Sequence, residues 1–294
     1  VTGTSVKSQL HSVPACQGIC KKAIASRLGE AYLMETLPET GAEYTVKVTI
    51  LKDRVTLTVD TSGSGLHKRG YRVKTVAAPI KETLAAAMVQ LSFWNKDRVL
   101  LDPCCGSGTI AIEAAMIGRN IAPGLSRSFA CEEWEAIDKK LWKEEKKRAY
   151  DLMDDEAKLD IVAIDIDKMA IEAAKENAIE AGVDDCIRFI NADMARIKAS
   201  KPSGIIITNP PYGERIGEQK QIAAIYSKYK KFFAENPSWS MFMVTTDKDI
   251  EAKVFGRKAD RRRKLYNGRL EVCYYQFHGK KLGDNGKAKQ PEQK

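Results

Sequence analysis

The chain contains 294 residues, and its 48 Lys and Arg outnumber its 39 Asp and Glu to give a formal net charge of +9. This length can bury a proper core in one large domain or in two modest ones. The basic balance favours a polyanionic partner. No stretch of about 18 consecutive apolar residues occurs, so no transmembrane helix is expected. Residues 1–10 lack the charged-then-apolar pattern of a signal peptide, and we expect a cytoplasmic location.

The cysteines and histidines are informative mainly by what they exclude. Seven cysteines and three histidines are spread irregularly along the chain, without paired C-x-x-C elements. Zinc sites built from these residues need such spacing, so no metal is expected. An odd number of cysteines without a disulfide framework is typical of reduced thiols in an intracellular protein.

The N-terminal 60 residues combine a helix with a hairpin. Residues 14–28 have the period of a short amphipathic helix, with Ile19 and Leu28 near one face. Residues 43–51 and 54–59 then alternate between apolar and polar, which predicts a β-hairpin with one buried face.

Composition divides the chain into three parts. A Ser- and Gly-rich stretch at 60–65 separates a first domain, residues 1–60, from a second domain over residues 61–278. The tail, residues 279–294, has almost no apolar side chains and is expected to be disordered.

From Pro79 onward, apolar runs alternate with helical patterns, which is typical of an α/β fold with a parallel sheet. Strands are predicted at 98–101, 161–164, 187–190, 204–208 and 241–245, with a final hairpin over 262–266 and 270–277. Helices are predicted at 80–92, 109–117, 132–150, 168–181 and 220–234. Asn267-Gly268 is a strong hairpin-turn signal. Asp167 and Gly182 are expected to cap the helix at 168–181. Five strands and a terminal hairpin predict a seven-stranded sheet, as opposed to the six parallel strands of a dinucleotide dehydrogenase.

Two short segments stand at the ends of predicted strands. Asp102-Pro-Cys-Cys-Gly-Ser-Gly-Thr109 is a glycine turn between an apolar run and a helical pattern. Asn209-Pro-Pro-Tyr212 follows the apolar run at 205–207 and ends it. Each segment alone is weak evidence of a function, since glycine turns and Asn-Pro turns have ordinary structural uses. In this order they resemble the cofactor loop and the amine-binding loop of S-adenosylmethionine-dependent methyltransferases that act on amino groups of nucleobases.

That resemblance implies a cofactor site at the carboxyl ends of the strands. Gly106 and Gly108 let the backbone approach the ligand, the amides opening the next helix favour the methionine carboxylate, and Asp102 can meet the amino end. The ribose needs an acid after the second strand, but residues 120–126 contain none. Asp165 supplies it after an insertion of roughly 40 residues, about 118–157. Asp193, after the third strand, can accept the adenine amino group. The complete expected set for the cofactor S-adenosylmethionine is Asp102, Cys104, Gly106, Ser107, Gly108, Thr109, Asp165, Ile166, Asp193, Met194 and Asn209.

The resemblance assigns catalysis to Asn209, Pro210, Pro211 and Tyr212. The Asn209 side-chain carbonyl and the Pro210 backbone carbonyl can accept both hydrogens of an aromatic amine and aim its nitrogen at the methyl group. The prolines stiffen the loop, and Tyr212 can stack on a base turned out of its helix. No metal is needed.

Several unrelated segments match a narrower family in order. They are Asp60–Arg72, Ala78–Ala86, Ile121–Gly124, Phe129–Trp134 and Gly256–Arg269. These segments resemble the THUMP-domain methyltransferases that modify guanine N2 in bacterial large-subunit ribosomal RNA. Residues 1–60 resemble the C-terminal part of a THUMP domain, and residues 61–278 resemble a Rossmann-like class I methyltransferase domain with a seven-stranded sheet.

The implied partner is RNA, either large-subunit ribosomal RNA or an assembling subunit. Two basic clusters fit an RNA path: Lys68, Arg69 and Arg72, and Arg261, Arg262 and Arg263. Either cluster can also be a plain solvated surface. The residues leave open a DNA adenine-N6 methylase, because adenine N6 and guanine N2 are both planar amines. A non-catalytic RNA-binding or assembly factor is the alternative of another class.

Overall fold

The computed structural model describes residues 1–76, 79–212 and 218–282. The described chain forms two compact units. The first unit contains Val1–Leu66 and Arg127–Arg148, and the second contains His67–Ser126 and the chain from Ala149 onward. Most of the tail expected to be disordered, residues 283–294, lies outside the described residues.

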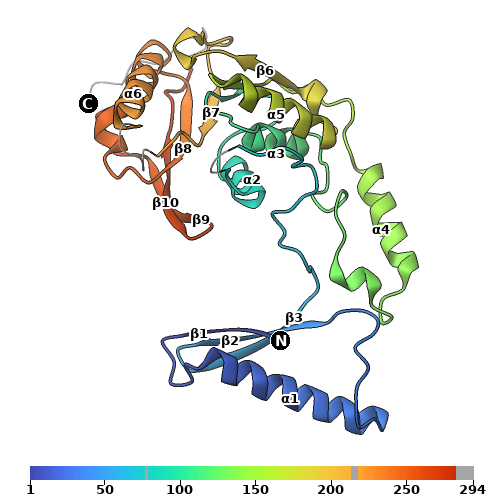
Figure 1. The fold of residues 1–294 in the computed structure, drawn as a ribbon. Coiled ribbons are helices and arrows are strands. Elements are labelled where there is room, and N and C mark those ends of the chain that lie inside the picture. Colours follow the sequence, from blue (N-terminus) through green and yellow to red (C-terminus); the bar gives the residue numbers. More distant parts are fainter. Residues whose placement is uncertain (77–78, 213–217, 283–294) are drawn as a thin grey trace. The chain divides into compact units, whose positions relative to one another are not determined.

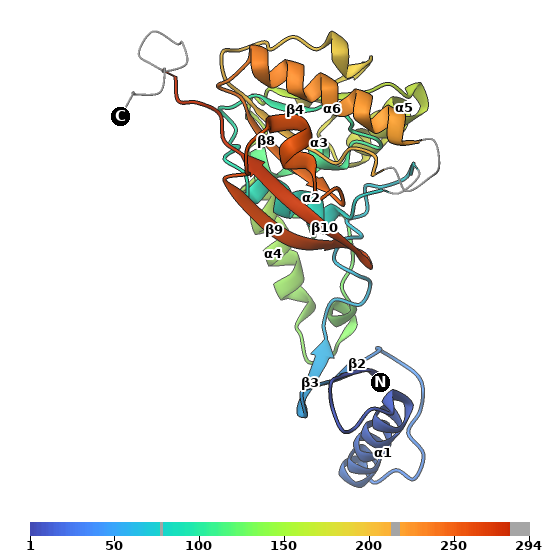
Figure 2. The same cartoon turned by 90° about the vertical axis from the view of Figure 1, so that its left-hand side faces the viewer.

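The first unit pairs a small sheet with one long helix (Figure 2). Its elements are β1 (Thr2–Val6), α1 (Val13–Tyr32), β2 (Thr45–Leu51), β3 (Arg54–Asp60), the 3-10 helix η1 (Ala130–Glu133) and the start of α4 (Lys139–Asp151). The sheet order is β1-β2-β3, with β1 parallel and β3 antiparallel to β2. The predicted hairpin and helix are confirmed, but β1 was missed because Thr-Gly-Thr-Ser-Val carries one large apolar residue.

The prediction that this hairpin buries one face is only half right. Val48 and Ile50 of β2 are buried, but Leu57 of β3, directly opposite Val48, is 60% exposed. The reason is that α1 packs against β1 and β2, so β3 receives no cover from it. Ile19 and Leu28 of α1 are likewise exposed.

The middle of the insertion that follows the first strand of the larger sheet, residues 127–148, packs within the first unit. The Trp134 ring stacks on Tyr44 at 4.6 Å between centroids, and its indole N–H donates to the Glu43 carbonyl. The Arg127 guanidinium donates to the backbone carbonyls of Ser62 and Gly65. These contacts tie residues 127–148 to the N-terminal sheet.

The second unit is the expected α/β domain. Its strands are β4 (Leu100–Asp102), β5 (Ile161–Asp165), β6 (Ile187–Asn191), β7 (Ile205–Thr208), β8 (Ser240–Thr245), β9 (Arg261–Asn267) and β10 (Leu270–Phe277). Its helices are α2 (Glu82–Gln90), α3 (Thr109–Gly118), α5 (Lys168–Glu180), α6 (Glu218–Glu235), η2 (Asp184–Cys186), η3 (Met194–Arg196) and the π-helical turn η4 (Glu251–Phe255). The strand order is β6-β5-β4-β7-β8-β10-β9, and β10 runs antiparallel to β8 and β9. The prediction of a seven-stranded sheet with a terminal hairpin is confirmed.

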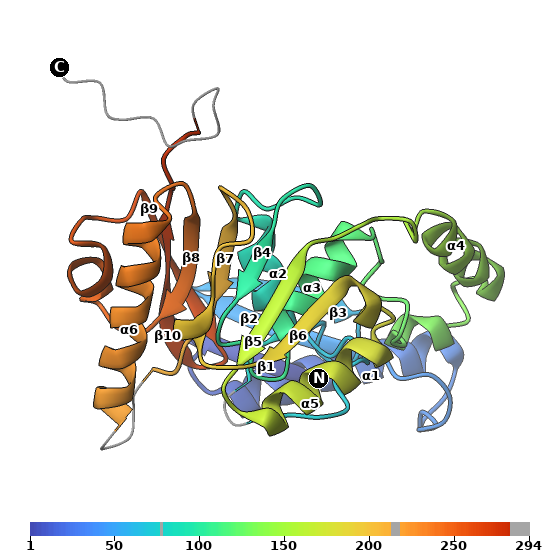
Figure 3. The same cartoon turned by 90° about the horizontal axis from the view of Figure 1, so that it is seen from above.

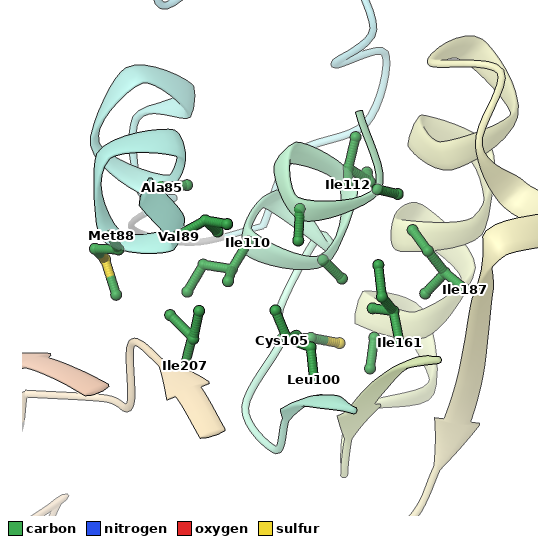
Figure 4. Packing of buried hydrophobic residues seen from close by; sticks show 14 of the residues in the cluster. Ala85, Met88, Val89, Leu100, Cys105, Ile110, Ile112, Ile161, Ile187 and Ile207 are labelled. Carbon is green, nitrogen blue, oxygen red and sulfur yellow. The ribbon is translucent and has the colours of Figure 1, made fainter. Parts of the chain in front are cut away.

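The central strands β4, β5, β7 and β8 read as continuous apolar runs because helices cover both faces of the sheet (Figures 1 and 3). On one face, α2, α3 and α5 pack against side chains such as Leu100, Ile161 and Ile207 (Figure 4). On the other, Tyr229 and Phe232 of α6 pack against a second apolar cluster. Full burial of one such side chain stabilises the fold by about 1.5–3 kcal/mol.

Local signals set several element ends. The Asp167 carboxylate accepts the Met169 N–H at 2.8 Å and caps α5, and Gly182 follows that helix with a φ of +67°. Gly268 turns the last hairpin with a φ of +66°. All three predictions are confirmed. Among the described helices, none combines the length and apolar character required to cross a bilayer.

Candidate active site

The site lies where the order of the sheet reverses. The chain leaves β4 for β5 and β6 and then returns to β7 on the other side of β4. The two parallel neighbours are in register, with Leu101 opposite Ile206. Their carboxyl ends therefore bring the glycine turn and the Asn209–Tyr212 loop to the same edge, at the switch point where open α/β sheets bind ligands.

The glycine turn depends on backbone conformations that favour glycine. Gly106 and Gly108 have φ angles of +52° and +81°. A Cβ at Gly108 would lie 2.9 Å from the Cβ of Ala174 on α5, so this glycine also permits close helix packing. The Cys105 N–H donates to the Ile164 carbonyl at 2.9 Å and fixes the turn to β5.

Asp165 is at the end of β5, beside the turn. Its Oδ2 accepts the Gly106 N–H at 2.9 Å, and its Oδ1 accepts the Asp167 N–H at 3.0 Å. Each carboxylate oxygen keeps acceptor capacity for a further donor. The next residue, Ile166, is 72% exposed. A fixed carboxylate suits the two hydroxyl groups of a ribose, and the exposed apolar side chain beside it suits the base attached to that ribose.

Asp102 is the most perturbed acid of the site. It is 1% exposed, and its Oδ2 has no hydrogen-bond partner among the described residues. Burial raises its pKa to about 8, against the Cys104 N–H, which stabilises the charged form. Burial also raises the pKa of the Cys104 thiol to about 12. A buried carboxylate oxygen with no partner fits a ligand ammonium, so Asp102 suits the amino acid end of S-adenosylmethionine. Asp102, the glycine turn and Asp165 together are called the cofactor cradle below.

Asp193 is held by two groups after β6. Its Oδ1 accepts the Ala195 N–H at 2.8 Å, and both of its oxygens accept from the Lys228 ammonium at 2.7 Å. The Ala195 N–H and the Lys228 ammonium together lower the pKa of Asp193. The carboxylate is therefore a charged acceptor, and Met194 follows it in the adjacent apolar cluster.

The amine-binding loop begins directly after β7. Pro210 is buried and Pro211 is exposed. The Tyr212 hydroxyl donates to the Oδ1 of Asn209. The proposed stacking ring and the proposed amine acceptor are thus in direct contact. The segment that follows, residues 213–217, lies outside the described residues.

Two arginines expected to contact RNA are engaged inside the protein instead. The Arg72 guanidinium donates to Glu82 Oε1 at 2.6 Å, to Ser107 Oγ at 3.2 Å and to Thr109 Oγ1 at 3.0 Å. Arg69 pairs with Glu113, which is 3% exposed. The hydroxyl oxygens of Ser107 and Thr109 therefore accept hydrogen bonds from Arg72 inside the protein.

Asn177 of α5 is a site residue that sequence reasoning missed. It is 1% exposed; its Oδ1 accepts the N–H groups of Val73 and Lys74, and its Nδ2 donates to the Ser107 carbonyl at 3.1 Å. A polar residue on the buried face of a helix is the only signal that could have pointed to it.

The second basic cluster lies on the edge strand β9 and is exposed. Arg262 contacts Glu251 at 3.6 Å, and the neighbouring Lys264 pairs with Glu271. Lys68 is also exposed. Arg261 and Arg263 point to the opposite face of the strand from Arg262. No group of three metal-binding side chains was found in the described ranges.

Fold and site together define a Rossmann-like class I methyltransferase. Comparison with known proteins agrees: residues 69–276 match the model of the RMKL-like methyltransferase domain, and residues 1–60 match the THUMP domain. The chain belongs to the RMKL-like methyltransferase family and carries a THUMP domain at its N-terminal end.

The relatives include “Putative RNA methyltransferase YpsC” of Bacillus subtilis, which is 48% identical over 95% of this chain and 73% of its own length. The ribosomal RNA large subunit methyltransferase K/L of Shewanella baltica is 40% identical over 81% of this chain, which covers only 34% of that protein. The crystal structure of SMU.472, described as a putative methyltransferase complexed with SAH, is 44% identical, with a TM-score of 0.88 over 96% of this chain and 75% of its own. The prediction of S-adenosylmethionine as cofactor is confirmed at the level of the family, because SAH is its demethylated form.

Proposed function

We propose that this protein transfers a methyl group from S-adenosylmethionine to the exocyclic N2 amine of a guanine in large-subunit ribosomal RNA. One observation carries the proposal. β4 ends at buried Asp102, whose Oδ2 has no partner among the residues that the structure describes, and the neighbouring parallel strand β7 is followed by Asn209, which contacts Tyr212. A ligand ammonium and a planar amine are the groups that these two ends would bind.

The residues that would hold the cofactor are spread over three strand ends. Asp102 would bind the ammonium, the amides of Ser107 and Thr109 the carboxylate, Asp165 the ribose hydroxyls and Asp193 the adenine amino group. When bound, S-adenosylmethionine supplies an electrophilic methyl group on its sulfonium.

The Asn209–Tyr212 loop would orient the amine. An aromatic amine delocalises its lone pair into the ring, so the site must hold both N–H groups to localise it. Asn209 Oδ1 has two lone pairs, so it can accept an amine hydrogen while the Tyr212 hydroxyl stays bound. The Pro210 carbonyl would accept the other hydrogen, and the Tyr212 ring would stack on the base.

The choice of RNA rests on the THUMP domain, the net charge of +9 and the names of the relatives. Of the residues first expected to contact RNA, Lys68, Arg261, Arg262 and Arg263 are exposed and stay in the proposal. Arg69 and Arg72 leave it because their guanidinium groups bind buried carboxylates. A cytoplasmic location and the choice between naked and assembling ribosomal RNA stay predictions.

The test is methylation with S-adenosylmethionine carrying a labelled methyl group, followed by mass spectrometry of the nucleosides. Ribosomal RNA from a strain lacking the gene is the substrate, and double-stranded DNA is the comparison. We expect labelled N2-methylguanosine from RNA and no label in DNA, because base-edge chemistry requires an unstacked base, which RNA loops supply at lower cost. N6-methyladenine in DNA would refute the substrate. RNA binding without methylation or cofactor binding would favour an assembly factor.

A further inference from the structure

Helix α6 places one hydroxyl group between the two strand ends that form the site. Tyr229 is fully buried, although it carries a polar oxygen. That oxygen lies 3.1 Å from the Thr208 hydroxyl and 3.8 Å from the Cys104 sulfur. Thr208 is the last residue of β7 and precedes Asn209, whereas Cys104 opens the glycine turn after β4. Tyr229 therefore contacts both halves of the site without facing either ligand.

The donors and acceptors of this cluster form a connected chain. The Thr208 side chain stabilises the charged form of Asp102 and so lowers the pKa of that carboxyl, which is consistent with a Thr208 hydroxyl that accepts from Tyr229 and directs its own hydrogen toward Asp102. The Cys104 thiol can donate to the phenol oxygen. Each hydroxyl then has a donor role and an acceptor role. Buried groups of this kind are costly when unpaired, so the cluster admits few alternative arrangements.

A second contact holds α6 in register with the site. The ammonium group of Lys228, the residue before Tyr229, donates to both carboxylate oxygens of Asp193 at 2.7 Å. The helix is thus anchored after β6 by Lys228 and after β4 and β7 by Tyr229. A shift of α6 would have to break both contacts.

We propose that Tyr229 is a positioning residue that sets the place of Asn209 relative to the cofactor cradle. It acts through Thr208, because the two hydroxyls meet one residue before the amine-binding loop. This inference rests on the proposed function of Asn209 as amine acceptor. Removing the phenol oxygen frees the end of β7 while leaving the cradle residues Asp102 and Asp165 in place.

Tyr229→Phe tests the proposal, since it removes only the hydroxyl. We expect single-turnover methylation to slow by about tenfold or more, since small misplacements of reacting groups cost up to about a hundredfold. The dissociation constant for S-adenosylhomocysteine should change by less than about threefold, because none of the cradle's own charge-assisted hydrogen bonds is lost. Hydrogen exchange at the amides of Ile207, Thr208 and Asn209 should accelerate in the variant, in the absence of any cofactor.

Tyr226→Phe is the matched control. Tyr226 is another buried tyrosine of α6, and the residues that act on the pKa of its hydroxyl are Thr245 and Asp247, at and just after the end of β8. This variant should keep the wild-type rate and the wild-type exchange at residues 207–209. Thr208→Val then tests whether Tyr229 acts through Thr208. If the two hydroxyls act as one unit, adding Tyr229→Phe to Thr208→Val should reduce the methylation rate by less than about a further twofold.

Three kinetic results would overturn the positioning role. They are a wild-type rate in Tyr229→Phe, equal losses in Tyr229→Phe and Tyr226→Phe, or multiplicative losses in the double variant with Thr208→Val. Failure of the proposed function looks different, because wild-type protein would then not methylate guanine N2 in ribosomal RNA. Unchanged exchange at residues 207–209 in Tyr229→Phe would overturn the positioning role even in that case.

Discussion

Replacing Arg72 with methionine should destabilise the second unit strongly. The Arg72 side chain is 17% exposed and pairs at 2.6 Å with Glu82, which is 6% exposed. The same guanidinium donates to the Ile80 carbonyl at 2.9 Å. Methionine fills similar space but leaves the Glu82 carboxylate buried without a counter-charge.

The expected loss follows from that uncompensated charge. Removing one partner of a buried ion pair costs about 3–5 kcal/mol. For a domain of about 150–250 residues, each kcal/mol lowers the melting temperature by about 2–4 °C, so a fall of about 6–20 °C is expected. The cofactor affinity should also weaken, because Ser107 and Thr109 of the glycine turn lose their donor.

Urea denaturation followed by far-UV circular dichroism measures this loss. The double variant Arg72→Met/Glu82→Leu should recover more than half of the stability, because it removes both charges. Arg261→Met, on an exposed strand, is the control and should change stability by less than about 0.5 kcal/mol. A loss below about 1 kcal/mol in Arg72→Met, together with a flatter salt dependence of RNA binding, would refute the structural role and return Arg72 to the RNA path.

Three further predictions concern the cofactor, the amine and RNA. Because burial raises the pKa of Asp102 to about 8, the folded protein keeps a proton that the unfolded chain releases near pH 4. The stability that this carboxyl contributes is therefore present at low pH and is lost as the pH rises through about 8. Cofactor binding at pH 7 should then release a proton, which calorimetry in buffers of different ionisation enthalpy measures. Asp102→Asn should abolish both the pH dependence of stability and this proton release. Equal proton release by Asp102→Asn would contradict the role of Asp102. Asn209→Ala should bind the cofactor normally but turn over about a hundredfold more slowly, while Tyr212→Phe should lose less than tenfold because the ring remains; single-turnover rates decide, and a fast Asn209→Ala would exclude the amide. Replacing Arg261 and Arg263 with glutamine should flatten the salt slope of RNA binding by up to about 1.4, at about 0.7 per lost phosphate contact, and an unchanged slope would leave them as plain surface charge.

The sheet and its loops could be predicted because their signals are local. Buried parallel strands read as apolar runs, and Gly106 and Gly108 mark a turn that requires positive φ angles. The cap at Asp167 is likewise written in adjacent residues. By contrast, β1 was missed because an edge strand with one covered face needs few apolar side chains.

The contacts of Arg69 and Arg72, and those of Tyr229, join residues that are distant in the sequence and so could not be predicted from it. Arg69 and Arg72 belong to a basic stretch that is typical of a solvated surface, and Glu113, the partner of Arg69, is 44 positions away in the sequence. Tyr229 lies on an amphipathic helix, where an aromatic residue predicts simple core packing. The hydroxyl of Thr208 gives that tyrosine a second role, and only tertiary structure brings the two together.

The assignment of residues 127–148 to the first unit means that the N-terminal module is not one uninterrupted piece of chain. The polypeptide passes between the units three times, and the last passage lies inside helix α4. A protein shortened to begin at His67 would keep Trp134 but lose Tyr44, the ring on which it stacks. A cut at any single point of the chain therefore cannot separate this module cleanly from the α/β unit.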